Sequence, residues 1–173
     1  EHLAAFIELL GSGEEWNAQF SYKVQEGASG IADALKLARD FVGREKFALV
    51  LGDNIFTESF ADAVKRYESG AQIFLKEVPD PERFGVAEIQ GESVVSIEEK
   101  PLRPKSKLAV TGLYFYDADA FVFLDQLKPS ARGELEITDL NNYYVTHGRM
   151  KAHIITGEWF DAGTHDALLE ASL

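Results

Sequence analysis

Phe47-Ala-Leu-Val-Leu-Gly-Asp-Asn-Ile-Phe56 is the segment from which the architecture of this chain is most readily inferred. Its first five residues are apolar and stop at the Gly-Asp-Asn break, a pattern that predicts a strand buried on both faces. In an open α/β sheet, ligands bind just outside the carboxyl ends of the strands. Asp53 follows this strand directly, so we expect its carboxylate at the rim of a binding edge.

Two interpretations of Asp53 are open at this point. Gly52 allows a tight turn or the close approach of a ligand, and Asn54 adds an amide that can donate or accept hydrogen bonds. A hard cation such as Mg²⁺ prefers carboxylate oxygens and is commonly held by one or two of them together with substrate phosphates. Alternatively, Asp53 only caps a turn or the next helix.

Hydrophobic periodicity predicts alternating helices and strands up to residue 78, which is typical of βαβ units. We therefore expect an α/β fold with a mainly parallel central sheet and helices on both faces. After Pro79 the pattern predicts a hairpin around Gly91-Glu92 at the sheet edge, and Gly112 inside a later strand indicates close approach of backbone or ligand. Helices are predicted at 2–10, 31–42, 60–67, 117–127, 134–146 and 165–173, and strands at 20–24, 47–51, 73–75, 84–89, 94–97, 109–116 and 151–156, with 157–164 as a loop.

Composition narrows the class of protein. The 173 residues are 46% hydrophobic, enough for the core of one domain. With 29 acidic and 17 basic residues the net charge is -12, which argues against binding duplex nucleic acid or an anionic membrane but not against binding a nucleotide. The absence of cysteine excludes disulfides, thiolate zinc sites and cysteine nucleophiles, and it is compatible with the cytoplasm, where we expect this protein. No apolar run approaches the length of a membrane span.

Three polar groups follow predicted strands: Asp53, the Glu99-Lys100 pair, and Asp161. Each also has an ordinary structural explanation. Glu99-Lys100 is typical of a solvated ion pair, and Asp161 is typical of a helix cap. The nearby Trp159 is typical of a core or an interface. Two aspartates far apart in sequence can nevertheless meet at one Mg²⁺, with a lysine neutralising a phosphate. Phosphoryl or nucleotidyl transfer requires this combination.

A further candidate is the loop Glu26-Gly-Ala-Ser-Gly30, which precedes a predicted helix. Free N–H groups at a helix N-terminus favour anions or polar rings, so this loop could receive a ligand. The alternative is an ordinary tight turn.

Together, these segments resemble the sugar-nucleotide pyrophosphorylases, and most closely the glucose-1-phosphate thymidylyltransferases. The resemblance runs through almost the whole chain. It is carried by Val24-Gln25 with Gly30, Ala48–Phe56, Asp80-Pro-Glu-Arg-Phe-Gly-Val86, Glu98-Glu-Lys-Pro101, Ala109-Val-Thr-Gly-Leu-Tyr-Phe-Tyr-Asp117, Lys128-Pro-Ser-Ala-Arg-Gly-Glu-Leu-Glu-Ile-Thr-Asp139 and Trp159-Phe-Asp-Ala-Gly-Thr164.

The resemblance implies a Rossmann-like nucleotidyltransferase fold with an antiparallel sugar-binding part. It implies that Gln25 and Gly30 read the nucleotide base, with Gln25 making a two-point hydrogen bond. By the same likeness, Asp53 and Asp161 hold Mg²⁺, and Lys100 binds the sugar phosphate. We expect these last three residues to carry catalysis.

The hexose pocket implied by the resemblance is lined by Gly85, Glu99, Val110 and Tyr114, with Trp159 as a wall. The implied reaction is attack of a glucose 1-phosphate oxygen on the α-phosphorus of dTTP, giving dTDP-glucose and pyrophosphate. Such a reaction needs alignment of two anions and charge screening, and no side-chain nucleophile. The family also forms homo-oligomers, which we expect for the full-length protein.

The chain departs from the family in several places. Residues 26–29 replace a proline-containing stretch, and Asp33 stands where close relatives usually have glutamine. The opening strand, the Gly-rich phosphate-binding loop and most of the helical tail are not found. We therefore interpret 1–173 as a single nucleotidyltransferase domain, incomplete at both ends and excised from a longer protein. Without the phosphate loop, and with two inner sheet edges unpaired, we expect these residues alone to be inactive.

Three alternatives stand beside this hypothesis. The first is a UTP-dependent pyrophosphorylase of the same family. The second is a non-catalytic sugar-nucleotide binding or regulatory module, which retention of Asp53, Lys100 and Asp161 together disfavours. The third is a glycosyltransferase, which the segments 98–101 and 159–164 do not favour.

Overall fold

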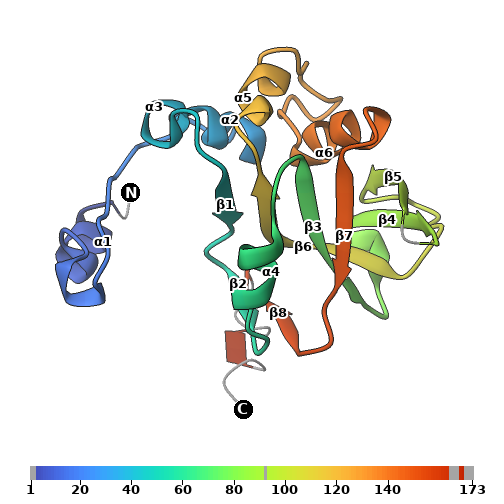
Figure 1. Cartoon of the computed structure of the whole chain (residues 1–173), viewed down its shortest axis with the longest axis horizontal. Helices are drawn as coiled ribbons and strands as arrows, with labels where there is room; N and C mark the ends of the chain where they lie inside the picture. The colour runs from blue at the N-terminus through green and yellow to red at the C-terminus, as the bar shows by residue number, and fades with distance from the viewer. Residues whose placement is uncertain (1–2, 92, 164–167, 170–173) are drawn as a thin grey trace.

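The computed structural model describes residues 3–91, 93–163 and 168–169. α1 (Leu3–Leu10) confirms the first predicted helix and, with the 3-10 turn η1 (Glu14–Trp16), lies apart from the rest of the molecule (Figure 1). Its apolar side chains Phe6 and Leu9 are 56% and 74% exposed. None of its residues is buried, so α1 adds nothing to the core of the described chain.

The main sheet has six strands. Five of them lie in the order β5 (Ser93–Glu99), β4 (Gly85–Gln90), β6 (Leu108–Tyr116), β3 (Ala71–Glu77) and β7 (Met150–Ile154). The sixth, β1 (Phe47–Val50), pairs with β6 so that Phe47 lies opposite Tyr116. The predicted β4–β5 hairpin is confirmed, and β5 forms an edge of the sheet.

The prediction of a mainly parallel sheet is wrong, although the α/β class is right. Among the strands that the structure describes, only β3 and β7 pair in parallel. β6 runs antiparallel to β1, β3 and β4. β1, β3 and β7 do share one direction, as the βαβ reasoning requires, but β6 returns through the sheet between β1 and β3. The strand after the hairpin therefore interrupts the parallel order.

Helices cover both faces of the sheet, as predicted. Because side chains alternate along a strand, Ile73 and Tyr114 face one core cluster, while Phe74 and Phe115 face the other. The first cluster packs under α2 (Ile31–Lys36), α5 (Asp119–Leu124) and α6 (Ile137–Thr146), and the second lies under α4 (Ala61–Arg66) (Figure 1). Fully burying a large apolar side chain such as Phe74 stabilises the fold by roughly 1.5–3 kcal/mol.

A second, two-stranded sheet pairs β2 (Asn54–Phe56) antiparallel with β8 (Trp159–Asp161). Asn54 lies opposite Asp161. The sequence predicted a loop at 157–164, because three residues are too few to show a strand period. This short ladder joins the segment after β1 to a segment more than a hundred residues later in the chain.

Several other predictions need correction. Residues 20–24 form no strand, because no strand within the described residues pairs with them. The helix predicted at 31–42 divides into α2 and α3 (Arg39–Val42). α6 begins at Ile137, later than predicted, so residues 134–136 belong to a loop. The helix predicted at 165–173 lies largely outside the described residues.

β1 is not buried on both faces. Its residues alternate between half-buried and exposed, and Val50 is 56% exposed. Among the described strands, β1 pairs with β6 alone, so its other edge has no strand partner there. Within the described ranges, no helix has both the length and the apolar character needed to span a bilayer.

Candidate active site

Two adjoining clefts collect the residues singled out by the sequence. The first has a volume of about 320 Å³ and the second about 420 Å³. They share Ile31, Leu51 and Glu134, so they are neighbours. The second is lined by Gln25 and Gly30. The first is lined by Asp53, Gly85, Glu99, Lys100, Val110, Tyr114, Trp159 and Asp161.

The β2–β8 ladder brings the two aspartates together. The Ala162 N–H donates to the Asp53 carbonyl oxygen at 2.7 Å. Asp161 Oδ1 and Asp53 Oδ2 lie 3.3 and 3.4 Å from the position that a Cβ would take at Gly163, so at most about 7 Å separates them. Glycine keeps the space between these carboxylates open, and any larger residue would fill it.

This space has the chemistry of a divalent-cation site. Mg²⁺ is usually held by one or two carboxylates, with water and substrate phosphates completing its six ligands. No cluster of three or more His, Asp or Glu able to hold a metal occurs in the described part of the chain. None is needed when phosphates supply the remaining oxygens, so Asp53 and Asp161 fit a cation that binds together with a phosphorylated substrate.

Asn54 connects the aspartate site to its surroundings. Its Nδ2 donates to Asp53 Oδ1 at 2.8 Å, while its Oδ1 accepts from the Gly112 N–H at 2.8 Å and from Trp159 Nε1 at 2.6 Å. A Cβ at Gly112 would lie 2.6 Å from the Asn54 amide, which explains the glycine inside β6. The close approach predicted at Gly112 is therefore made by the Asn54 side chain.

Glu99 is oriented by two donors. Thr138 Oγ1 donates to its Oε2 at 2.6 Å, and an Arg132 guanidinium nitrogen lies 3.5 Å from its Oε1. A Cβ at Gly85 would lie 3.4 Å from both Glu99 Oε2 and Thr138 Oγ1, so glycine leaves this wall open. The carboxylate therefore keeps acceptor sites that the hydroxyl groups of a ligand in the cleft could use.

Tyr114 and Val110 form a buried wall of the same cleft. Burial raises the pKa of the Tyr114 phenol well above its ordinary value, and the nearby Glu99 and Asp53 carboxylates raise it further. The phenol is thus neutral at physiological pH, and its role is limited to packing and neutral hydrogen bonding.

Lys100 has an unusual backbone. Its φ of 44° lies in the left-handed region, which non-glycine residues rarely adopt, and Pro101 follows it directly. The Lys100 N–H donates to the Phe84 carbonyl at 3.0 Å, which helps to hold this conformation. Strain of this kind costs on the order of 1–3 kcal/mol and tends to occur at functional sites. Within the described ranges the ammonium forms no ion pair, so it is available to a ligand.

Arg132 is a further cation of the cleft, and the sequence assigned it no role. It forms a forked pair with Glu136, with its closest contact at 2.8 Å, and lies 3.8 Å from Glu134. The Glu136 hydrogen bond raises the pKa of Arg132. An arginine in an acidic loop suggests only surface pairing from sequence, and its place in the cleft depends on how the loop before α6 folds.

Gln25 lies beside the second cleft with its amide already engaged. Its Nε2 donates to the Gly30 carbonyl at 3.1 Å and to Asp33 Oδ2 at 3.2 Å. Gly30 has a φ of 100°, and a Cβ there would lie 2.4 Å from the Leu135 carbonyl oxygen. Only glycine fits this position, so the backbone alone explains why residue 30 is glycine, whether or not a ligand binds there.

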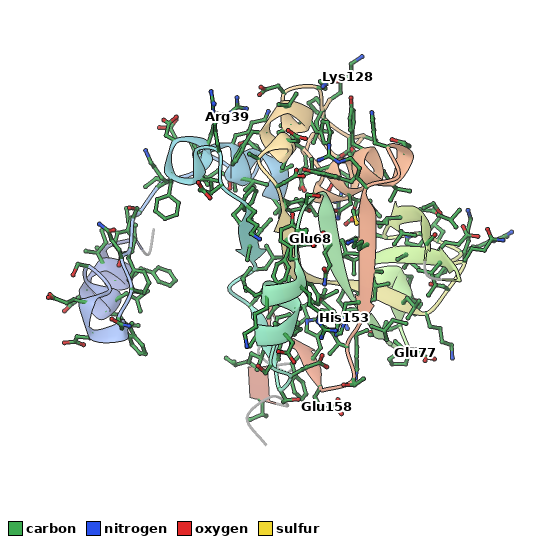
Figure 2. All side chains as sticks on the ribbon, in the orientation of Figure 1. Arg39, Glu68, Glu77, Lys128, His153 and Glu158 are labelled. Carbon is green, nitrogen blue, oxygen red and sulfur yellow. The ribbon has the colours of Figure 1, made fainter. Side chains whose placement is uncertain are left out.

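Glu58 fastens the turn that leads from β7 into β8. It accepts hydrogen bonds from the N–H groups of Thr156 and Gly157 at 2.8 and 2.9 Å, and it lies 3.0 Å from His153 Nε2, which Figure 2 labels on β7. The Gly157 N–H, followed by the imidazole, lowers the pKa of Glu58 to about 2. This carboxylate therefore stabilises the approach to the segment that carries Trp159 and Asp161.

Comparison with known proteins identifies the family of this chain. The model of the family described as nucleotidyl transferase matches residues 1–173. The chain belongs to this family. A glucose-1-phosphate thymidylyltransferase of Neisseria meningitidis serogroup A is 48% identical over 99% of this chain, and the chain spans 62% of that curated relative's length. The resemblance read from the sequence is thereby confirmed.

Solved structures agree on the fold of this nucleotidyl transferase chain. A crystal structure from Bacillus anthracis, assigned as a glucose-1-phosphate thymidylyltransferase and containing a sucrose, superposes with a TM-score of 0.93 at 49% identity, covering 99% of this chain and 71% of that one. A UDP-glucose pyrophosphorylase complexed with UDP-glucose superposes with a TM-score of 0.81 at 25% identity, covering 98% and 71%. The Rossmann-like nucleotidyltransferase fold expected from the sequence is confirmed.

Proposed function

We propose that the full-length protein transfers a thymidylyl group from dTTP to glucose 1-phosphate, forming dTDP-glucose and pyrophosphate. The observation that carries this proposal is the meeting of Asp53 and Asp161 in one cleft that also holds Lys100. Relatives named for this activity are 48% and 49% identical to the chain. Because the chain spans 62% of the curated relative's length, the activity is proposed for the full-length protein.

In this reaction, a phosphate oxygen of glucose 1-phosphate bonds to the α-phosphorus of dTTP as the bond from that phosphorus to the bridging oxygen breaks. Pyrophosphate carries away the electron pair, and no proton transfer is needed. Asp53 and Asp161 would hold Mg²⁺. When bound there, the cation neutralises phosphate charge and orients the phosphates for in-line displacement.

The chain's own residues supply positioning and charge. Lys100 brings an ammonium without an ion pair in the described ranges to the sugar phosphate, and Arg132, held by Glu136 in the same cleft, adds guanidinium N–H donors. Glu99, held by Thr138, accepts hydrogen bonds from the sugar hydroxyls. The walls formed by Gly85, Val110, Tyr114 and Trp159 surround the hexose, and the base enters the neighbouring cleft beside Gln25 and Gly30.

We also propose that the protein works in the cytoplasm as a homo-oligomer, as the family resemblance implies. The cysteine-free composition suits a reducing compartment. Light scattering of the full-length protein tests the assembly, and a monomer at micromolar concentration would contradict it.

Pyrophosphate release by the full-length protein tests the proposed reaction. We expect turnover with dTTP and glucose 1-phosphate, and a loss of about a hundredfold or more in kcat for Asp53→Asn and Asp161→Asn. Asp62→Asn removes an exposed carboxylate of α4, 76% exposed and outside the cleft, and should keep wild-type activity. Faster turnover with UTP would favour the UTP-dependent reaction, and no turnover with either nucleotide would contradict the proposal.

A further inference from the structure

The amide of Gln25 is fixed in one orientation by its two partners. One partner is the Gly30 backbone carbonyl and the other is the Asp33 carboxylate, both reached from Nε2. A carbonyl and a carboxylate only accept hydrogen bonds, so turning the amide over would set its oxygen against two other oxygens. The nitrogen must therefore face Asp33 and Gly30.

This arrangement uses the whole donor capacity of Gln25. A primary amide carries two N–H hydrogens, and two acceptors already face them. Within the described residues no donor reaches Oε1, and Gln25 lines the second cleft. Towards a ligand in that cleft, Gln25 can therefore act only as an acceptor.

We propose that Asp33 makes Gln25 an acceptor-only reader of the nucleotide base, an inference that rests on the proposed function. A thymine base in a nucleotide has a single ring N–H, at N3. The one hydrogen bond available is therefore from N3–H to Gln25 Oε1, and the base O4 receives none from this residue. The inference thus replaces the two-point hydrogen bond implied by the family resemblance with a single one.

The apolar lining of the cleft increases the effect of this single hydrogen bond on affinity. The cleft is lined largely by apolar side chains, among them Ile31, Leu35 and Leu49. In such surroundings an unpaired donor or acceptor costs more than a lost bond in water. A base with a lone pair at N3, as in cytosine, leaves Oε1 facing another acceptor, whereas uracil presents the same N–H as thymine. Gln25 therefore selects for the imide and does not separate thymine from uracil.

Calorimetric titration of the full-length protein with three nucleotides tests the inference. The probes are dTTP, its 4-thio analogue, whose sulfur accepts hydrogen bonds poorly, and its N3-methyl analogue, which lacks the N–H. We expect the wild type to bind the 4-thio analogue within about twofold of dTTP and the N3-methyl analogue at least about tenfold more weakly.

Asp33→Ala frees one N–H of Gln25, which can then donate to O4. We expect this variant to bind dTTP about fivefold more tightly than the 4-thio analogue, which is the value of one ordinary hydrogen bond. Asp40→Ala is the matched control, because Asp40 is an exposed carboxylate of α3 that is not hydrogen-bonded to Gln25. It should reproduce the wild-type pattern.

The outcomes separate this inference from the proposed function. If the wild type binds dTTP but loses affinity for the 4-thio analogue, or binds all three probes equally, the acceptor-only role is overturned and the proposed function stands. If the Asp33→Ala variant binds dTTP and the 4-thio analogue equally tightly, Asp33 does not restrict Gln25. The inference is then also overturned. If the full-length protein binds no dTTP at all, both proposals are wrong.

Discussion

Replacing Asn54 by alanine tests whether one amide organises the cleft that contains Asp53 and Asp161. Asn54 orients Asp53, holds the Gly112 N–H of β6 and fixes the Trp159 indole, through three hydrogen bonds of 2.6–2.8 Å. The variant removes all three bonds at once. The variant keeps both carboxylates, so a loss of activity would come from a change in their orientation.

The structure allows the size of the effect to be estimated. Each lost hydrogen bond costs about 1 kcal/mol net, and two partly buried N–H donors lose their acceptor, so Asn54→Ala should lower the free energy of unfolding by about 2–4 kcal/mol. Groups that orient a metal ligand typically affect metal affinity or activity by about 10–100-fold. We therefore expect kcat/KM for pyrophosphate release to fall by about that factor.

The assay combines urea denaturation, pyrophosphate release and tryptophan emission. Trp16 is 61% exposed, so a Trp16→Phe background removes the Trp16 emission at little structural cost. The Trp159 emission should change when its 2.6 Å hydrogen bond is lost. Asn142→Ala is the control, because Asn142 makes two hydrogen bonds with the Ile97 backbone outside the cleft and should lose stability while keeping kcat/KM. A stability loss below about 1 kcal/mol with unchanged kcat/KM would refute the role of Asn54.

Three further predictions follow from single contacts. Gly112→Ala places a Cβ 2.6 Å from the amide that packs there, so the free energy of unfolding should fall by about 1–3 kcal/mol in urea denaturation, and no loss would contradict the close approach. Thr138→Val removes the 2.6 Å hydrogen bond to Glu99 and should raise KM for glucose 1-phosphate about fivefold while KM for dTTP changes little, so an equal rise in both would oppose the assignment. Glu58 has a pKa lowered from 4.5 to about 2, chiefly by the Gly157 N–H, so its contribution is complete above pH 4.5 and disappears as the pH falls towards 2. Glu58→Gln should therefore cost about 2 kcal/mol at pH 7, and a gap to wild type that stays constant through that acid range would show the reasoning to be wrong.

The sequence predicts most of the local elements because their periods are long enough to recognise. The hairpin around Gly91, the long strand that contains Gly112 and the helix of α4 all occur where the apolar pattern and the turn residues place them. The strand direction of β6 could not be inferred, because direction depends on where the chain re-enters the sheet after the hairpin. Residues 20–24 have the composition of a strand, but a strand also needs a partner.

The candidate site also has a part that a local sequence pattern predicts and a part that depends on tertiary contacts. Asp53 could be proposed from its place directly after an apolar strand, a local signal. Its meeting with Asp161 depends on the three-residue β2–β8 ladder, which has no recognisable period. The bond from Trp159 to Asn54 joins residues 105 positions apart, and the place of Arg132 depends on the path of a loop. Contacts of this kind are set by tertiary packing, so no local pattern reveals them.

The most decisive single measurement is the anomalous scattering of Mn²⁺ in crystals of the full-length protein grown with dTDP-glucose. We predict one peak within about 2.0–2.3 Å of carboxylate oxygens from both Asp53 and Asp161, in contact with the nucleotide phosphates. A peak held by only one of these residues, or the absence of any peak between them at saturating Mn²⁺, would contradict the shared cation site.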